Sequence, residues 1–220
     1  MEANINPFAL WGVALVVFLA ILGVSKVYER RRREAFAAYA LTHGCNFDAE
    51  CESVRERLAS VFPLFSLGHS PTWRYAMSGS RGGTPFTMFE FLYVTGGGRS
   101  SQTHYHAIVV WERPEGVFPS FVAAPETWWD RVKQRFGARD FDFPDDPAFS
   151  AAYQLQGEDE AQVRALFDST KRSYLMGHPG VHVAGSERYL LWWRPERLPP
   201  PEELDGFLAD GDAVRGVFLR

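Results

Sequence analysis

An uncharged stretch of eighteen residues near the N-terminus constrains this chain more than any other feature. It runs from Phe8 to Ser25 and reads FALWGVALVVFLAILGVS. A helix rises about 1.5 Å per residue, so this stretch would be roughly 27 Å long, enough to cross the hydrocarbon core of a bilayer. A helix that is apolar on every face is typical of a membrane span. The sequence therefore predicts a transmembrane helix over residues 8–25.

The flanks of this stretch favour a retained anchor over a cleaved signal peptide. A signal peptide needs a basic segment before the apolar run and a small-residue cleavage site after it. Residues 1–7 contain no Lys or Arg, and the run ends in Lys26-Val27-Tyr28. Trp11 and Tyr28 stand where the two headgroup layers would be, as aromatic residues of membrane spans often do. We expect the anchor to remain in the mature protein.

Basic residues follow the apolar run and predict its orientation. These candidates for contact with the membrane surface are Lys26, Arg30, Arg31, Arg32 and Arg33. Positive residues stay on the cytoplasmic side, so the rule places the N-terminus outside and the rest of the chain in the cytoplasm. The sequence thus indicates a single-pass membrane protein. Its expected parts are a tail (1–7), the span (8–25), a basic juxtamembrane helix (26–44) and a cytoplasmic domain (45–220).

The composition of the chain indicates a folded domain that does not bind nucleic acid. Of the 220 residues, 46% are hydrophobic and 15% aromatic, which suffices for a sizeable core. The formal net charge is -4, and residues 34–220 contain 18 basic against 25 acidic residues. Nucleic-acid binding depends on a basic surface. We therefore expect the lipid bilayer, and a protein at the membrane, as partners.

The periodicity of the domain predicts an α+β fold. Segments rich in aromatic and β-branched residues, typical of strands, are 72–77, 86–95, 103–112, 120–123, 151–155, 181–184 and 188–193. Segments with helical spacing or capping signals are 49–62, 126–136, 158–170 and a last one from about 202. We expect one antiparallel sheet with flanking helices. Phe86–Thr95 and Thr103–Glu112 should pair at its centre, across the Gly-rich residues 96–101.

Two short matches suggest an internal α-β-β duplication. Val54-Arg55 recurs as Val163-Arg164, and Leu67-Gly68-His69 recurs as Met176-Gly177-His178, at the same offset. In each copy a predicted helix leads through a Gly-His turn into a hairpin. Because few residues are identical, a chance match stays open beside the duplication.

The sharpest candidate for chemistry is the pair His104 and His106. Side chains two residues apart on a strand share one face, so both imidazoles could ligate one metal ion. A catalytic zinc usually has three protein ligands, and the sequence nominates no third one. We expect a polar strand face with both rings partly solvated. A membrane-bound metal-dependent hydrolase that uses His104 and His106 is the alternative.

Other features of the sequence favour a non-enzymatic protein without a cofactor. The nucleophile motif G-x-S-x-G, the zinc motif H-E-x-x-H and the dinucleotide motif G-x-G-x-x-G are missing. Cys45 and Cys51 lack the spacing of a zinc site, and in a reducing cytoplasm we expect two free thiols.

Two tryptophan pairs are candidates for contact with a partner. They are Trp128-Trp129 and Trp192-Trp193. Neighbouring side chains on a helix or strand point in different directions, so one Trp of each pair should pack in the core. The other could be exposed and anchor a protein partner.

The order of these parts resembles a widespread group of bacterial membrane-anchored proteins of unknown function. The matching stretches are the anchor with RRRREAFAAYALTHGCNF, then TPFTMFEFLYVTGGGRSSQTHYHAIVV, FPSFVAAPE, DFDFPDDPAFSAAYQLQGEDEAQVRALF and RYLLWWRPERLPPPEEL. The resemblance covers nearly the whole chain but rests on hydrophobic and turn positions. It implies a single-pass protein of a bacterial inner membrane, and no catalytic residue can be carried over from it. The sequence as a whole predicts a membrane-tethered cytoplasmic domain with a binding or scaffolding role.

Overall fold

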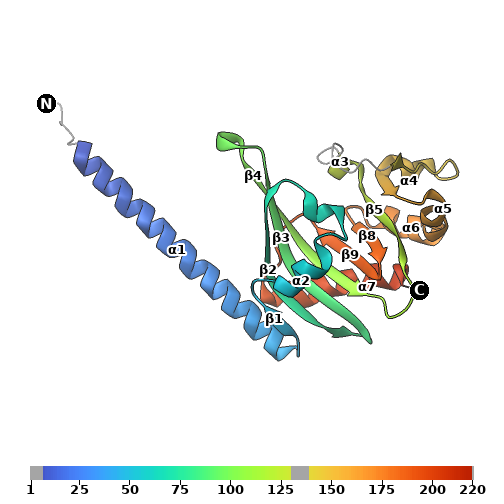
Figure 1. The fold of residues 1–220 in the computed structure, drawn as a ribbon, viewed down its shortest axis with the longest axis horizontal. Helices are drawn as coiled ribbons and strands as arrows, with labels where there is room; N and C mark the ends of the chain where they lie inside the picture. The colour runs from blue at the N-terminus through green and yellow to red at the C-terminus, as the bar shows by residue number, and fades with distance from the viewer. Residues whose placement is uncertain (1–6, 130–138, 220) are drawn as a thin grey trace.

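A nine-stranded antiparallel sheet forms the centre of the part of the protein that the structure describes (Figure 1). This computed structural model describes residues 7–129 and 139–219, with the backbone alone at 7–10, 12–15 and 139. Neighbouring strands follow the order β1-β2-β3-β4-β9-β8-β5-β7-β6. The strands are β1 (Asn46–Asp48), β2 (His69–Arg81), β3 (Thr84–Thr95), β4 (Gln102–Glu112), β5 (Phe118–Pro125), β6 (Arg139–Asp140), β7 (Tyr153–Gly157), β8 (His182–Glu187) and β9 (Tyr189–Arg194).

The central hairpin predicted from the sequence is confirmed. Strands β3 and β4 pair antiparallel in continuous register from Phe86 opposite Trp111 to Thr95 opposite Gln102. The strand expected over 72–77 is longer in the structure, because β2 continues to Arg81. Gly82 and Gly83 alone connect the two strands, with φ of +57° and +76°. A two-residue hairpin turn with positive φ at both positions favours glycine, which explains this dipeptide.

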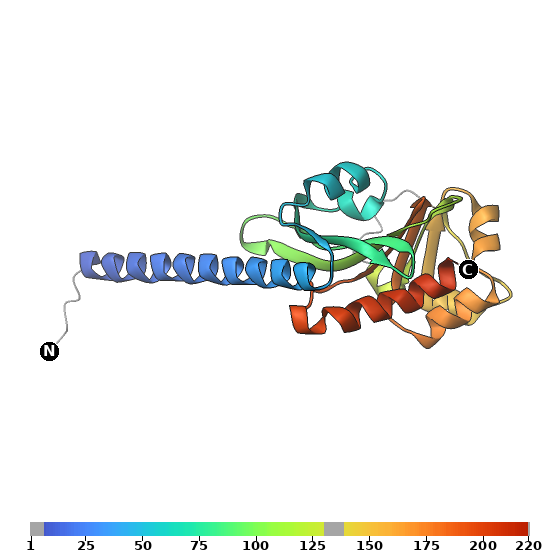
Figure 2. The same cartoon turned by 90° about the horizontal axis from the view of Figure 1, so that it is seen from below.

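Helices cover both faces of the sheet (Figure 2). Helix α2 (Glu52–Leu58), a 3-10 turn (Pro63–Ser66) and α3 (Glu126–Trp129) pack on one face. The end of α1 (Pro7–Thr42) and helices α4 (Pro147–Ala152), α5 (Glu160–Leu166), α6 (Ser169–Gly177) and α7 (Leu204–Phe218) pack on the other. Two further 3-10 turns span Gly98–Ser100 and Pro201–Glu203. The sheet thus lies between two hydrophobic cores, which is why its central strands are apolar on both faces.

Helix α1 belongs to the domain at one end and stands free at the other. Phe36, Tyr39 and Ala40 are buried against the sheet, and Tyr39 donates a hydrogen bond of 2.7 Å to Asp205 of α7. The boundary expected at residue 45 is therefore wrong, because the last turns of the helix contribute to the core. Gly44 follows the helix with a left-handed φ of +65°, as a C-terminal glycine should.

The membrane span stays a prediction. Among the side chains that the structure describes, no helix is both long enough and apolar enough to span a bilayer. Side chains 8–10 and 12–15 of the expected span lie outside the described residues. Within the described part, residues 7–42 form one continuous α-helix.

Several local expectations differ from the structure. The helix expected over 158–170 is divided, because the Asp168 side chain accepts a hydrogen bond from the Lys171 backbone N–H and thereby caps a new helix, α6. The helix expected over 49–62 is shorter, and the short strand β1 precedes it. Residues 130–136 of another expected helix lie outside the described residues. The helices of the two suggested repeats, α2 and α5, pack on opposite faces of the sheet. The duplication stays a prediction.

Candidate functional site

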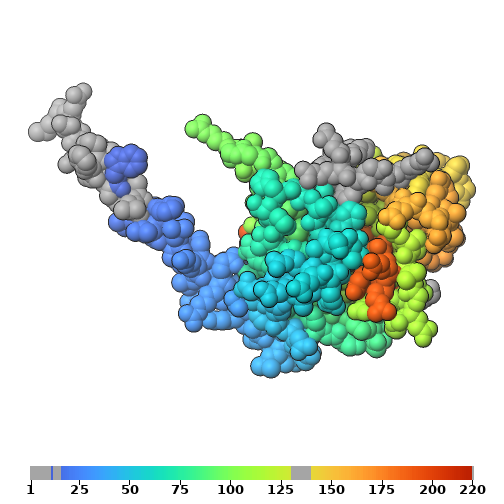
Figure 3. All heavy atoms as spheres, viewed as in Figure 1, coloured from blue at the N-terminus to red at the C-terminus, as the bar shows by residue number. Residues whose placement is uncertain are grey.

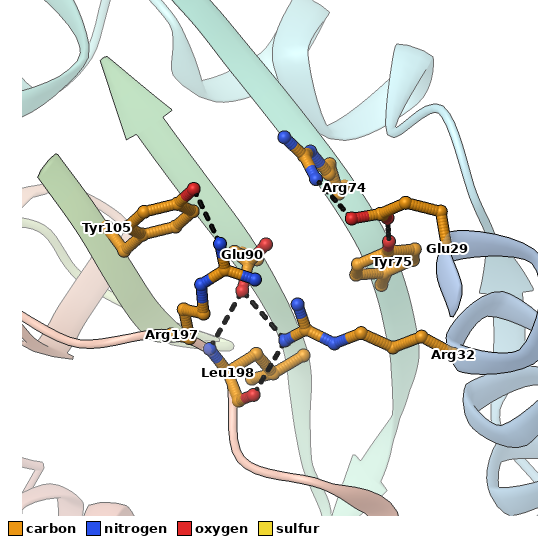
Figure 4. A network of polar contacts seen from close by, with 8 residues as sticks. All are labelled: Glu29, Arg32, Arg74, Tyr75, Glu90, Tyr105, Arg197 and Leu198. Carbon is orange, nitrogen blue, oxygen red and sulfur yellow. Dashed lines mark hydrogen bonds and ion pairs between the residues drawn. The ribbon is translucent and has the colours of Figure 1, made fainter. Parts of the chain in front are cut away.

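A buried carboxylate connects the middle of the sheet to helix α1. Glu90 is the single charged residue of strand β3 and is fully buried. Its Oε2 atom accepts hydrogen bonds from Arg32 Nη2 at 2.9 Å and from the Leu198 backbone N–H at 3.0 Å (Figure 4). Arg32 Nη2 also donates to the Leu198 carbonyl at 2.8 Å. One ion pair thus joins three segments that are far apart in the sequence: α1, β3 and the segment after β9.

Arg32 is not free to contact the membrane surface, which corrects one of the five basic residues expected there. Its side chain is only 10% exposed. Its guanidinium also lies over the rings of Phe36 and Tyr75, at 5.3 and 5.2 Å from their centres, where the aromatic faces attract a cation. Helical periodicity explains the difference, since residues 32, 36, 39 and 40 lie on the face that packs on the sheet. The other four, Lys26, Arg30, Arg31 and Arg33, are exposed.

A second set of contacts fixes the same helix to strand β2. The Tyr75 hydroxyl donates a hydrogen bond to Glu29 of α1, and Arg74 Nη1 lies 3.4 Å from Glu29 Oε1 (Figure 4). Burial, followed by the bond to Glu29, raises the pKa of Tyr75 to about 12, so this hydroxyl stays protonated and donates. Tyr75 has a φ of +59°, in a bulge where the register shifts between Arg74 and Met77. Bulges re-aim side chains in this way.

The segment that follows β9 is held across the sheet by a third contact. Arg197 Nη2 donates a hydrogen bond of 2.7 Å to the Tyr105 hydroxyl of β4, and its guanidinium lies 4.2 Å from the centre of that ring (Figure 4). This contact keeps Leu198, whose backbone bonds both Glu90 and Arg32, in place. Together, the eight residues of Figure 4 form a polar junction between the helix and the sheet.

A groove opens beside this junction. It has a volume of about 540 Å³ and lies between α1, the loop before α2 and strand β2. Its lining residues are Glu29, Arg30, Arg33, Ala49, Glu50, Thr72, Trp73, Arg74 and Tyr75. Arg33 Nη1 lies 3.3 Å from Glu50 Oε1, and Arg30 Nε bonds Glu34 at 2.8 Å. Charged side chains therefore line much of the groove, with arginines from both the helix and the sheet.

The structure places His104 and His106 on one face, where both rings stack on Tyr93. His104 is partly exposed, as expected, whereas the expected solvation of His106 is wrong, because His106 is only 2% exposed. Neither ring nitrogen of His106 has a hydrogen-bond partner among the described residues. Burial, followed by the nearby His182 and His104, lowers the pKa of His106 to about 3. His104 Nε2 bonds the Thr95 hydroxyl at 2.8 Å.

The described residues do not gather into a metal site. No group of three or more His, Cys, Asp or Glu side chains among them could hold one ion. Cys45 and Cys51 are free thiols, and burial raises the pKa of both, to about 12 for Cys51. A thiol with a raised pKa is a poor nucleophile at neutral pH.

All four tryptophans proposed as partner contacts are buried, so that expectation is wrong. Trp128, Trp129, Trp192 and Trp193 are exposed by 5% or less. Trp192 packs on Phe207 of α7, and Trp193 packs on Trp128 on the opposite face of the sheet. Both members of a pair can be buried because helices cover both faces.

Sequence reasoning missed the residues of the polar junction, above all Glu90, Arg74, Tyr75 and Arg197. One signal was present, since Glu90 is the single charged residue of FTMFEFLYVT. A carboxylate in such a strand must be either paired or protonated, because burying an unpaired charge is costly. Its partner could not be chosen from the sequence.

Comparison with known proteins supports the fold. A comparison with protein-family models finds no match, and no curated protein matches the chain either. Among solved structures, the chain is similar to the crystal structure of the mycobacterial trehalose monomycolate transport factor A. The TM-score is 0.57 at 13% sequence identity, over 81% of this chain and 88% of the other. At this identity the likeness shows a shared α+β fold alone.

Proposed function

We propose that this protein is a membrane-tethered domain with a binding or scaffolding role and no enzymatic one. The observation that carries the proposal is the continuity of helix α1, which runs from Pro7 into the domain and is fixed there by the buried Arg32–Glu90 pair. The apolar residues 8–25 at the free end of the same helix supply the anchor. An anchor joined to the domain without a flexible linker sets the domain's distance from the bilayer and its orientation.

The topology of this proposal follows from the charges. Lys26, Arg30, Arg31 and Arg33 are exposed directly after the apolar residues, which favours a cytoplasmic domain and an outer N-terminus. The structurally similar protein is described as a transport factor, which supports a binding or scaffolding role more than an enzymatic one. Among the described residues no third ligand accompanies His104 and His106, so nothing there favours the hydrolase alternative.

The anchor and topology are tested by fractionation of the full chain. We expect the protein to stay with membranes after an alkaline wash, and a reporter fused after Arg220 to be active only in the cytoplasm. A Val16→Arg/Leu19→Arg variant should move to the soluble fraction, because charges at the centre of a span are costly. Wild-type protein in the soluble fraction would overturn the proposal.

The scaffolding role is tested by rotating the domain relative to the anchor. Two alanines inserted between Ser25 and Lys26 rotate the domain by about 200°, whereas four alanines rotate it by only about 40° past a full turn. If orientation matters, cross-linked adducts formed in native membranes should survive the insertion of four alanines and disappear with two. Equal adducts from both variants would contradict a rigid scaffold.

A further inference from the structure

The groove beside α1 combines arginines from two elements that only the tertiary structure brings together. Arg30 and Arg33 come from the helix, and Arg74 comes from strand β2. Two carboxylates, Glu29 and Glu50, share the same lining, and Glu34 beside it pairs with Arg30 at 2.8 Å, so the site depends on the remaining N–H donors and not on an excess of positive charge. A guanidinium presents five N–H donors in a planar fork, which matches the oxygens of a phosphate group.

Existing ion pairs leave most of these donors available. Arg33 and Glu50 make one contact of 3.3 Å, and their side chains are 56% and 72% exposed. Arg74 and Glu29 also make a single contact, of 3.4 Å. An exposed pair such as Arg33–Glu50 contributes at most about 1 kcal/mol, so an incoming phosphate can replace it at little cost. The remaining N–H donors of Arg74 can bind a phosphate while its contact with Glu29 stays.

The helix arginines of the groove lie at the outer edge of the headgroup layer in the proposed orientation. Arg30 and Arg33 follow the end of the apolar run by five and eight residues, or about 8 and 12 Å along the helix, and side chains on a helix tilt toward its N-terminus, which here is the side of the bilayer. The headgroup layer on each side of a bilayer is roughly 5–8 Å thick. Figure 3 shows that α1 stands clear of the domain on its N-terminal side and meets the domain surface at its other end. Figure 1 shows the β3–β4 tip, which carries the exposed Arg99, extending toward that same side.

Only some of the exposed basic residues of helix α1 line the groove. Lys26, Arg30 and Arg33 are spaced by four and three residues and share one face of the helix. Arg31 lies between them in the sequence and is also exposed, but it does not line the groove. Arg31 therefore serves as a control that distinguishes binding in the groove from a general attraction of basic residues to the membrane.

We infer that this groove binds the phosphate of an anionic glycerophospholipid headgroup at the membrane surface, with Arg30, Arg33 and Arg74 as donors. This inference rests on the proposed membrane tether. Binding there would add a headgroup contact to the anchor and would favour one rotation of the domain about the helix axis. Soluble phosphate offers the same oxygens, but only a lipid is held at this height by the membrane itself.

Native mass spectrometry of the full chain, released from detergent with added phosphatidylglycerol or phosphatidylcholine, tests the inference. We expect phosphatidylglycerol to bind preferentially. Arg33→Gln and Arg74→Gln should each weaken that binding about tenfold, as for the loss of a charge-assisted contact. Arg31→Gln should change it by less than about twofold, and Arg33→Gln, an exposed substitution, should leave the folded state intact.

Three outcomes would overturn the inference. They are an equal loss in Arg31→Gln and Arg33→Gln, equal binding of the two lipids, or displacement of the lipid by millimolar inorganic phosphate. In all three cases the chain would still be found in the membrane fraction. Failure of the membrane tether would instead appear in the fractionation experiment, as release of the chain into the soluble fraction.

Discussion

The carboxylate of Glu90, in the middle of the sheet, is paired with the guanidinium of Arg32, 58 residues earlier in helix α1, at 2.9 Å. Glu90 is fully buried, and the Arg32 side chain is 10% exposed. Each of these buried charges needs the other as its partner, because either one alone would be a buried charge without compensation. The position of the helix on the sheet is therefore coupled to the stability of the domain.

Removing one partner of this pair should destabilise the protein strongly. We expect Arg32→Met to lower the free energy of unfolding by about 3–5 kcal/mol, since it leaves Glu90 charged and buried. The Arg32→Met/Glu90→Met double variant should recover most of that loss. Urea unfolding of the full chain in detergent, followed by tryptophan fluorescence, measures both. Arg31→Met is the matched control and should change the free energy by no more than about 0.5 kcal/mol.

The length of helix α1 that the domain needs can be tested by truncation. A chain that begins at residue 26 keeps Glu29 and Arg32, whereas one that begins at residue 34 lacks both. We expect the shorter chain to unfold at a lower urea concentration, with a difference of about 3–5 kcal/mol, because Glu90 loses its partner. Glu90→Gln should restore part of the stability of the shorter chain. Equal midpoints for the two chains would show that the pair does not stabilise the fold.

A charge on the opposite face of β3 should also be costly. Phe89 is fully buried and stacks on Trp73, at 5.1 Å between ring centres, under α2. We expect Phe89→Asp to destabilise the domain by more than about 4 kcal/mol, because it buries an unpaired carboxylate and leaves a cavity. Val117 is 72% exposed, so Val117→Asp serves as the control and should change stability little. Circular dichroism during thermal unfolding distinguishes the two.

The buried His106 predicts a dependence of stability on pH. Its pKa is about 3 in the folded protein, against an ordinary value of 6.5. As the pH falls below 6.5, the imidazole of His106 takes up a proton in the unfolded chain but not in the folded one. The contribution of His106 to the free energy of unfolding is therefore fully present above pH 6.5 and is lost as the pH falls toward about 3. Between about pH 7 and pH 5 we expect a loss of about 2 kcal/mol in urea unfolding.

The matched variant for this prediction is His106→Phe, which keeps an aromatic ring beside Tyr93 and removes the titrating group. Between pH 7 and pH 5, the free energy of unfolding of this variant should decrease by about 2 kcal/mol less than that of the wild type. The same pH dependence in wild type and variant would assign the effect to another group.

Much of the fold was predictable from the sequence, whereas the junction was not. The pairing of β3 with β4 followed from β-rich composition on either side of a Gly-rich turn, which is a local signal. The division at Asp168 of the helix expected over 158–170 depended on a capping bond that composition alone did not reveal. Glu90 was visible as a lone charge in an apolar strand, but no local pattern connects it to Arg32 or to the backbone of Leu198.

The sequence by itself determined the features that depend on neighbouring residues. These are the continuous N-terminal helix, the central hairpin and the alternation that places His104 and His106 on one face. Tertiary structure alone decided which faces are covered, and this is why His106 and all four paired tryptophans are buried. It also decided that Arg32 points into the domain while Arg31, one residue earlier, points out. The physical reason is that burial depends on what packs against a residue, and the packing partners come from distant parts of the chain.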